Sequence, residues 1–202
     1  MKICVIDYGL GNLASVYNAL LTLGGNPRIS DLPEDIEKAD KIVLPGVGSF
    51  QDAMLGLEKR GLAHTLKKAI LSGKLYLGIC LGLQILFEKS EEGKRAGLSI
   101  LKGRVKRFDE KTGVKVPHIG WNTVSLKSTE CKLFRDIEED AYFYFDHSYY
   151  GEPEEKSLAA GNTKYGISFS SVIHKDNIYA VQFHPERSQG LGLEVLKNFI
   201  NL

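Results

Sequence analysis

The chain has 202 residues, of which 43% are hydrophobic and 25% are charged, a composition typical of a folded globular protein. Its net charge of +1 gives no electrostatic reason to expect nucleic acid or an anionic membrane as a partner. Three widely spaced cysteines without a C-x-x-C pair argue against a disulfide framework and for a reducing compartment. Apolar stretches all fall well short of ~20 residues and a strand begins at once, so we expect a cytoplasmic protein.

The first half of the chain alternates between strand-like and helix-like periodicity. Strands are predicted at residues 2–7, 27–30, 40–44 and 75–79, and helices at residues 12–23, 51–58 and 62–71. Such alternation is typical of a parallel sheet covered by helices. Active sites in these sheets lie beyond the carboxyl ends of the strands, so the loops that follow them are the places to search.

The second half reads as short strands joined by polar turns. These strands are predicted at residues 103–108, 114–117, 122–126, 141–150, 158–161, 167–174 and 178–183, with a final helix at 191–200. No linker or repeat separates the halves. We therefore predict an α/β fold of three layers, a mainly parallel mixed sheet flanked by helices with added antiparallel strands, in which residues 1–202 form one domain.

A glycine-flanked cysteine lies between a predicted strand and residues 83–87, which read as the first turns of a helix. Residues 78–82 are Gly-Ile-Cys-Leu-Gly, and the two glycines permit a sharp turn that holds Cys80 in a strained, exposed position. The dipole at a helix N-terminus favours a thiolate over a thiol. This pattern predicts an activated nucleophile, whereas Cys4 and Cys131 are predicted to be packed in the interior.

A His-Pro-Glu tripeptide follows the last predicted strand. Pro185 biases His184 toward an extended backbone, so Glu186 can accept from one imidazole nitrogen while the other faces a thiol. We predict that His184 is the base and acid and that Glu186 orients it. Alone, the tripeptide could be a surface turn, but a cysteine elbow far upstream strengthens the catalytic interpretation.

Residues 9–14 match the relaxed dinucleotide pattern G-x-G-x-x-A, and Asp31 lies near the end of the second strand. Against a cofactor, the Asp7 carboxylate would repel a pyrophosphate at the strand end, and the chain is short for a substrate half as well. A dinucleotide-binding module therefore stays open as an alternative from a different class.

A second glycine loop, at residues 45–50, follows the third predicted strand. It lacks the Gly-Lys-Ser/Thr of a P-loop, so we do not expect a phosphate site there. We expect the loop to direct the backbone N–H of Val47 at a developing oxyanion, with the N–H of Leu81 as second donor.

Together these motifs resemble class I (triad-type) glutamine amidotransferases. The likeness runs from end to end, and its segments are residues 7–13, 45–48, 78–84, 117–122, 144–150 and 184–186. The resemblance implies a flavodoxin-like arrangement of the three layers. It also implies that the Cys80 thiolate attacks L-glutamine, releasing ammonia and then glutamate through a thioester, without a metal or cofactor.

The resemblance also implies contacts beyond the triad of Cys80, His184 and Glu186. Substrate contacts are expected at Gly46, Gly48, Gln84, Glu92, Ser148 and Tyr149. Partner-facing residues are expected at Asn12, Trp121, Tyr144 and Arg187. His118 and His147 are structural by default, since no spacing makes them zinc ligands. Asp146 departs from the pattern, which has an apolar residue there.

The closer likeness is to a branch whose glutaminase subunits pass ammonia to a (β/α)8-barrel cyclase in histidine biosynthesis. A heterodimer with such a cyclase is expected, because ammonia released into water becomes mostly ammonium, which is not a nucleophile. We also expect the isolated chain to be a weak glutaminase, because the loop at residues 45–48 would adopt its oxyanion-binding conformation only when the partner and its acceptor bind. Another ammonia-donating glutaminase subunit remains an alternative.

Overall fold

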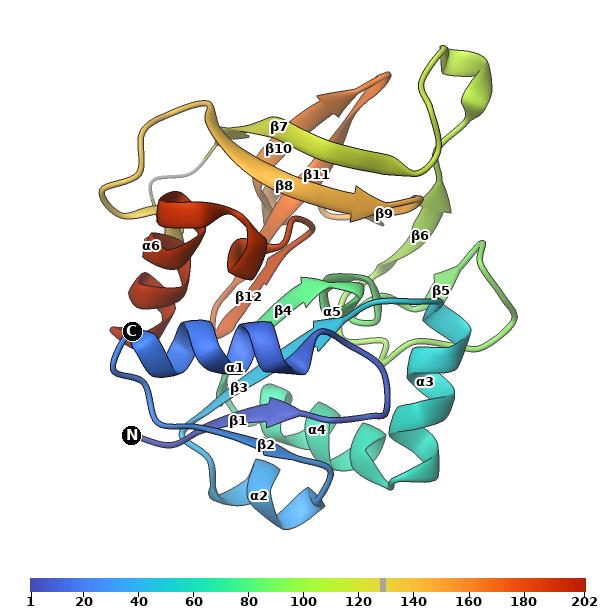
Figure 1. Cartoon of the computed structure of the whole chain (residues 1–202). Helices are drawn as coiled ribbons and strands as arrows, with labels where there is room; N and C mark the ends of the chain where they lie inside the picture. The colour runs from blue at the N-terminus through green and yellow to red at the C-terminus, as the bar shows by residue number, and fades with distance from the viewer. Residues whose placement is uncertain (128–129) are drawn as a thin grey trace.

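The computed structural model describes residues 1–127 and 130–202. Within these ranges nine strands form one sheet, in the order β2-β1-β3-β4-β12-β11-β10-β7-β8, and β5, β6 and β9 form a second. The half from β2 to β12 is parallel, and the half from β12 to β8 is antiparallel. Figure 1 shows the antiparallel half standing above the helix-covered parallel half. This architecture confirms the predicted fold class.

The parallel half contains strands β1 Ile3–Ile6, β2 Pro27–Ser30, β3 Lys41–Gly46, β4 Leu75–Cys80 and β12 Ile178–Val181. The antiparallel half and the small sheet contain β5 Lys89–Ser90, β6 Gly103–Arg107, β7 His118–Leu126, β8 Ala141–His147, β9 Tyr149–Pro153, β10 Ala159–Tyr165 and β11 Ile167–Lys175. The helices are α1 Leu13–Thr22, α2 Pro33–Lys38, α3 Phe50–Lys59, α4 Leu62–Leu71, α5 Leu81–Gln84 and α6 Gln189–Ile200. None of these described helices is long and apolar enough to cross a membrane.

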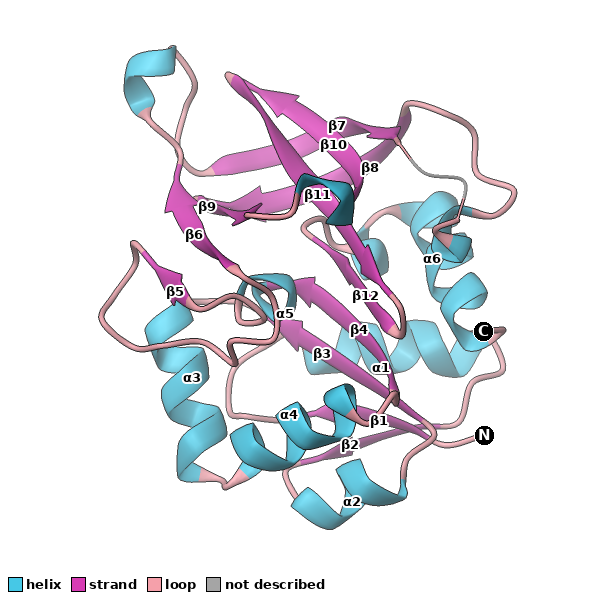
Figure 2. Ribbon diagram, turned by 180° about the vertical axis from the view of Figure 1, so that it is seen from behind, coloured by secondary structure: helices cyan, strands magenta, loops and turns pink. Residues whose placement is uncertain are grey.

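Side chains of the central strands alternate between two hydrophobic clusters, one on each face of the sheet. In β1, Ile3 and Val5 pack in the cluster covered by α1 and α6, whereas Cys4 and Ile6 pack in the cluster covered by α2, α3 and α4. Figure 2 shows the second group of helices in front of the sheet. Burial on both faces explains why these strands are almost entirely apolar.

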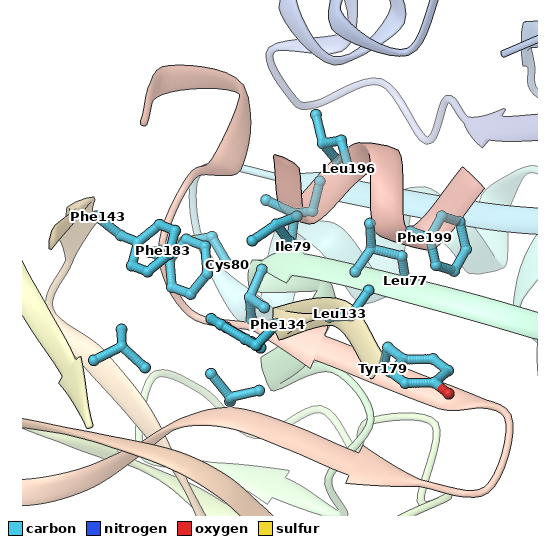
Figure 3. Packing of buried hydrophobic residues seen from close by; sticks show 14 of the residues in the cluster. Leu77, Ile79, Cys80, Leu133, Phe134, Phe143, Tyr179, Phe183, Leu196 and Phe199 are labelled. Carbon is cyan, nitrogen blue, oxygen red and sulfur yellow. The ribbon is translucent and has the colours of Figure 1, made fainter. Parts of the chain in front are cut away.

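Strands β4 and β12 are parallel neighbours although they lie far apart in the sequence. Their register pairs Ile79 with Val181, so the residues that follow each strand leave the sheet side by side. In Figure 3, Cys80 at the end of β4 lies near Phe183, which follows β12. The sheet therefore places the cysteine and the His-Pro-Glu segment at one edge.

Two predicted strands are wrong. Residues 114–117 form no strand and contain a cis Val116–Pro117 peptide, and the ladder begins only at His118 because proline has no N–H to donate. The segment at residues 141–150 is two strands, not one: β8 pairs with β7 in the large sheet, whereas β9 pairs with β6 in the small one.

The helix predicted after Cys80 is shorter than its apolar pattern indicates, because α5 ends at Gln84. The next carbonyl groups accept bonds from a later loop, since the N–H groups of Leu98 and Ile100 donate to Ile85 and Leu86. This loop takes the place of further helical turns. Helix α2 and strand β5 have only six and two residues, and the sequence pattern did not predict them.

Candidate active site

Cys80 occupies a strained turn between β4 and α5. Its backbone has φ 54° and ψ −103°, a conformation rare for a residue with a Cβ. Neither flanking glycine has room for a side chain: a Cβ on Gly78 would lie 2.5 Å from the Gly82 carbonyl, and one on Gly82 would overlap the Leu44 carbonyl. The strained turn matches the prediction, but the predicted exposure is wrong, because Cys80 is only 5% exposed.

His184 and Glu186 are buried together beside Cys80. Nδ1 of His184 lies 2.9 Å from Oε1 of Glu186, and their side chains are 2% and 1% exposed. His184 is extended, as predicted, whereas Glu186 lies in a 3₁₀ turn at Pro185–Arg187. The expected approach of imidazole and carboxylate is thus achieved by a tight turn after an extended residue.

The electrostatics of His184 depend on both neighbours. Burial alone would lower its pKa, but the charge of Cys80, followed by the hydrogen bond to Glu186 and the charge of that carboxylate, raises the pKa to about 10. Within the described residues, Nε2 of His184 has no hydrogen-bond partner. That nitrogen is therefore free to exchange a proton with the Cys80 sulfur and with a substrate.

Ser188 fixes the backbone of His184 to the antiparallel half of the sheet, a role the sequence analysis missed. Its buried hydroxyl donates to the His184 carbonyl at 2.6 Å and accepts from the Tyr144 N–H at 2.9 Å. The His184 N–H in turn donates to the Tyr144 carbonyl at 2.9 Å. These bonds restrain the imidazole through its main chain.

A cavity of about 360 Å³ opens over Cys80. It is lined by predicted site residues, namely Val47, Gly48, Cys80, Leu81, Gln84, Glu92, Ser148 and Tyr149, and also by Pro117, Asp146 and His147. Gly46, His184 and Glu186 are not among the lining residues; Gly46 lies beneath the loop, paired in register with Cys80. One cavity thus unites the predicted nucleophile, oxyanion donors and most substrate contacts.

Gly46 must be a glycine because Tyr8 and Leu81 occupy the space where its Cβ would lie. The Tyr8 hydroxyl is buried and has no hydrogen-bond partner among the described residues. Burial and, after it, the charge of Cys80 raise the pKa of Tyr8. The phenol therefore stays neutral beneath the glycine loop, close to both backbone positions predicted as oxyanion donors.

The two predicted substrate side chains are held by the protein backbone. Gln84 is 4% exposed, and its Nε2 donates to the Tyr149 carbonyl at 2.8 Å, which leaves its carbonyl oxygen for another donor. Oε2 of Glu92 accepts from the Phe50 N–H at 2.6 Å, and burial raises its pKa despite this bond. Both side chains are fixed before any ligand arrives.

Gln182 is a further side chain at the nucleophile that the sequence analysis missed. It is fully buried, and its Nε2 donates to Sγ of Cys80 at 3.4 Å. Gln182 directly follows β12 and precedes His184 by two residues. In the segment predicted as a strand to residue 183, such spacing places two side chains on the same face. That spacing is the signal that could have identified it.

His118 and His147 form a buried pair next to the cavity. Nδ1 of His118 lies 3.0 Å from Nε2 of His147, whose Nδ1 donates to the Tyr149 carbonyl at 2.8 Å. Burial lowers the pKa of His118 to about 4 and that of His147 to about 3. Both rings are therefore neutral at pH 7, and the described residues contain no group of three or more potential metal ligands.

Three of the four residues predicted to face a partner lie in contact on the surface. The Arg187 guanidinium stacks over the Tyr144 ring at 4.2 Å, and the Trp121 and Tyr144 rings meet edge to face at 6.1 Å. Trp121 is 46% exposed, a large fraction for a tryptophan. Asn12 is also exposed, immediately before α1, apart in sequence from this cluster.

The first glycine loop presents an anion where a dinucleotide would place its phosphates. Oδ1 of Asp7 accepts from the Gly9 N–H at 2.8 Å, and a Cβ on Gly9 would meet the Arg60 guanidinium at 2.7 Å. The backbone donor of the loop is thus already used by a carboxylate, which does not favour the cofactor alternative.

The sequence matches the family model for Glutamine amidotransferase class-I over residues 4–202. The chain therefore belongs to the class I glutamine amidotransferase family, and the resemblance read from its motifs is confirmed.

Two relatives with similar sequences over nearly the whole chain carry the same name. A protein of Gloeothece citriformis (strain PCC 7424), named imidazole glycerol phosphate synthase subunit HisH, is 49% identical over 98% of this chain and 95% of that protein. The subunit of the same name from Microcystis aeruginosa (strain NIES-843 / IAM M-2473) is 47% identical over 98% of this chain and 94% of that protein.

Solved structures share the fold at lower identity. The PurLQS structure from Thermotoga maritima superposes with a TM-score of 0.78 at 20% identity, over 99% of this chain and 97% of that one. The glutaminase domain of Trypanosoma brucei CTPS with bound acivicin has a TM-score of 0.70 at 13% identity, over 100% of this chain and 91% of that one.

Proposed function

We propose that this protein, a single domain over residues 1–202, is the glutaminase subunit of an imidazole glycerol phosphate synthase. It hydrolyses L-glutamine to L-glutamate and ammonia for a cyclase partner in histidine biosynthesis. The observation that carries this proposal is the buried arrangement of Cys80, His184 and Glu186 beside one cavity. The full-length identity to subunits named HisH supports the choice of synthase.

The chemistry follows from the positions of these groups. The Cys80 thiolate attacks the side-chain amide carbon of glutamine, and the tetrahedral oxyanion is stabilised by the N–H groups of Val47 and Leu81. Leu81 is the first residue of α5, so its N–H has no acceptor within the helix. His184, held by Glu186, protonates the departing ammonia and leaves a γ-glutamyl thioester on the sulfur. His184 then takes a proton from water, which releases glutamate.

The proposed substrate contacts other than Gly46 line the cavity. In this proposal the carbonyl oxygen of Gln84 accepts from the ammonium group of glutamine, which is supported by the bond that already engages the amide nitrogen with Tyr149. Glu92 supplies a second acceptor, and the backbone of Gly46, Gly48, Ser148 and Tyr149 completes the site. Free ammonia would become mostly ammonium in water, so a closed path to the partner is needed.

The surface formed by Trp121, Tyr144 and Arg187, together with Asn12, is our proposed contact with the partner. We propose that this partner is a (β/α)8-barrel cyclase in a heterodimer, since an exposed tryptophan, a tyrosine and an arginine are the residue types that anchor interfaces. The cyclase would combine the ammonia with its ribotide substrate to form imidazole glycerol phosphate and aminoimidazole carboxamide ribotide.

The decisive experiment mixes the purified chain with a cyclase barrel and measures glutamate release. Glutamine turnover should be low for the chain alone and should rise when the barrel and its ribotide substrate are both present. Cys80→Ala should abolish this turnover, while Cys4→Ala should not. An unchanged rate in Cys80→Ala would overturn the proposed function, and full activity of the isolated chain would contradict its dependence on a partner.

A second measurement tests the site itself. A glutamine-mimicking alkylator should label Cys80, because burial raises the pKa of both Cys4 and Cys131 to about 11 and keeps them as thiols. Preferential labelling of Cys4 or Cys131, located by mass spectrometry, would remove the nucleophile assignment.

A further inference from the structure

Gln182 links the sulfur nucleophile to the wall of the glutamine cavity. Its Nε2 donates to Sγ of Cys80 at 3.4 Å, and its Oε1 accepts from Nε2 of Gln84 at 3.3 Å. The side chain is completely buried, so water does not compete for either bond. The backbone is also held, because the Gln182 N–H donates to the Ser171 carbonyl at 2.9 Å.

The direction of these bonds follows from a backbone carbonyl. The Tyr149 oxygen can only accept, so the Gln84 atom 2.8 Å from it must be the amide nitrogen. That nitrogen is also the Gln84 atom nearest Gln182, which must therefore present its carbonyl oxygen. The remaining end of the Gln182 amide is the NH2 group, and it faces the sulfur. Each amide orientation is thereby determined by its neighbour.

The same Tyr149 carbonyl also accepts from Nδ1 of His147. The cavity wall from His147 to Gln84 is therefore joined by hydrogen bonds to the nucleophile through the side chain of Gln182, in addition to the contact of the sulfur with the Asp146 carbonyl. An apolar residue would fill the same volume without either bond. A buried amide costs free energy unless it is bonded, so packing alone does not account for it.

We propose that Gln182 is a hydrogen-bond donor to the Cys80 thiolate, and that it couples the charge state of the sulfur to the orientation of the Gln84 amide. The inference rests on the proposed function for its consequence in turnover, but its direct effect is on the sulfur. An N–H donor stabilises the anionic sulfur more than the neutral thiol, because hydrogen bonds to charged groups are the stronger ones. The Gln182 donor would then supply part of the stabilisation of the thiolate that His184 would otherwise have to supply alone in the resting enzyme.

The test measures how fast iodoacetamide alkylates Cys80 in the full chain as a function of pH. Gln182→Met keeps the side-chain length and removes the donor, and Gln182→Glu keeps the shape and places a carboxylate against the sulfur. We expect the alkylation profile of Gln182→Met to move up by about one pH unit, so that alkylation is about tenfold slower at pH values below the wild-type midpoint. The shift should be larger in Gln182→Glu. In the complex with a cyclase, glutamine turnover should fall with the thiolate fraction.

Ser171→Ala is the matched control. Ser171 is also fully buried, and its hydroxyl is bonded to Thr163 rather than to the site, so this variant loses a buried hydrogen bond without touching the sulfur. Its alkylation profile should match the wild type. Wild-type profiles in both folded Gln182 variants would overturn the inference and would leave the proposed glutaminase intact. Turnover that survives Cys80→Ala would instead overturn the proposed function.

Should either Gln182 variant fail to fold, the wild-type chain still tests the inference. The side-chain amide resonances of Gln182 in ¹⁵N-labelled protein should shift with the same pH midpoint as Cys80 alkylation. Gln182 amide resonances that stay constant through that midpoint would show that no bond to the thiolate exists.

Discussion

Nδ1 of His184 lies 2.9 Å from Oε1 of Glu186, in a pocket from which water is excluded. Because the carboxylate can only accept, this bond keeps the proton of a neutral imidazole on Nδ1. Nε2 is then the basic nitrogen, and among the described residues it has no hydrogen-bond partner. The bond between His184 and Glu186 therefore determines that, in the neutral imidazole, Nε2 is the nitrogen that can accept a proton from the thiol.

Glu186→Gln should lower the kcat for glutamine by roughly 10²–10⁴-fold with little change in KM. The amide keeps the shape of the side chain but can donate to Nδ1, which stabilises the wrong tautomer, and it no longer stabilises the imidazolium. Steady-state kinetics of the complex measure this effect. Glu58→Gln, on the exposed surface of α3, should change nothing. A loss below about threefold in Glu186→Gln would show that the carboxylate does not orient the base.

Gly82→Ala should destabilise the fold by more than about 2 kcal/mol, because the new Cβ would overlap the Leu44 carbonyl in the neighbouring strand. Urea unfolding gives the free energy. Gly190→Ala is the control: its Cβ would meet no atom within 4 Å, and alanine favours the helix by up to about 1 kcal/mol. Equal free energies of unfolding for the two variants would contradict the tight packing of Gly82 against Leu44.

The alternation of strands and helices could be predicted from periodicity, and the elbow could be predicted from Gly78, Cys80 and Gly82. The burial of Cys80 could not, because the cover comes from residues distant in sequence: Asp146, whose carbonyl lies 3.9 Å from the sulfur, and the cavity wall beside it. Local sequence carries no signal for which loop will close over a turn.

The roles of Gln182 and Ser188 could not be predicted from the sequence either. Gln182 contacts Cys80 only because β12 pairs in parallel with β4, and sequence pattern does not determine which strands become neighbours. The Ser188 hydroxyl accepts from the N–H of Tyr144, 44 residues away. Each is a polar side chain whose role depends on strand order, whereas His184 and Glu186 could be predicted because they lie two residues apart in one motif.

The buried histidine pair should make the protein sensitive to acid. In the folded state the pKa of His118 is about 4 and that of His147 about 3, both below the value of 6.5 expected for the unfolded chain. The unfolded chain therefore binds more protons as pH falls below 6.5, and stability present above pH 6.5 is lost toward pH 4 and below. For His118 this loss is on the order of 3 kcal/mol between pH 7 and pH 4.

Urea unfolding at several pH values between 4 and 7 measures this loss. His118→Gln should be less stable than the wild type at pH 7 and should show a shallower fall in stability toward pH 4. His64→Gln, at an exposed position on α4, should keep the wild-type slope. An unchanged slope in His118→Gln would show that the histidine is not excluded from protonation by folding.

Asp146→Val restores the apolar residue of the family pattern and should leave both fold and nucleophile unaffected. The Asp146 side chain is exposed and pairs with Arg187 at 3.4 Å, and exposed ion pairs contribute about 0–1 kcal/mol. Only its backbone carbonyl approaches Cys80, and Arg187 stays bonded to the Tyr144 hydroxyl at 3.2 Å. Unfolding free energy and Cys80 alkylation should therefore match the wild type. Affinity for the cyclase, measured by calorimetry, should fall by less than in Arg187→Ala, since the stacked guanidinium remains. A loss of alkylation in Asp146→Val would show instead that the carboxylate acts on the sulfur.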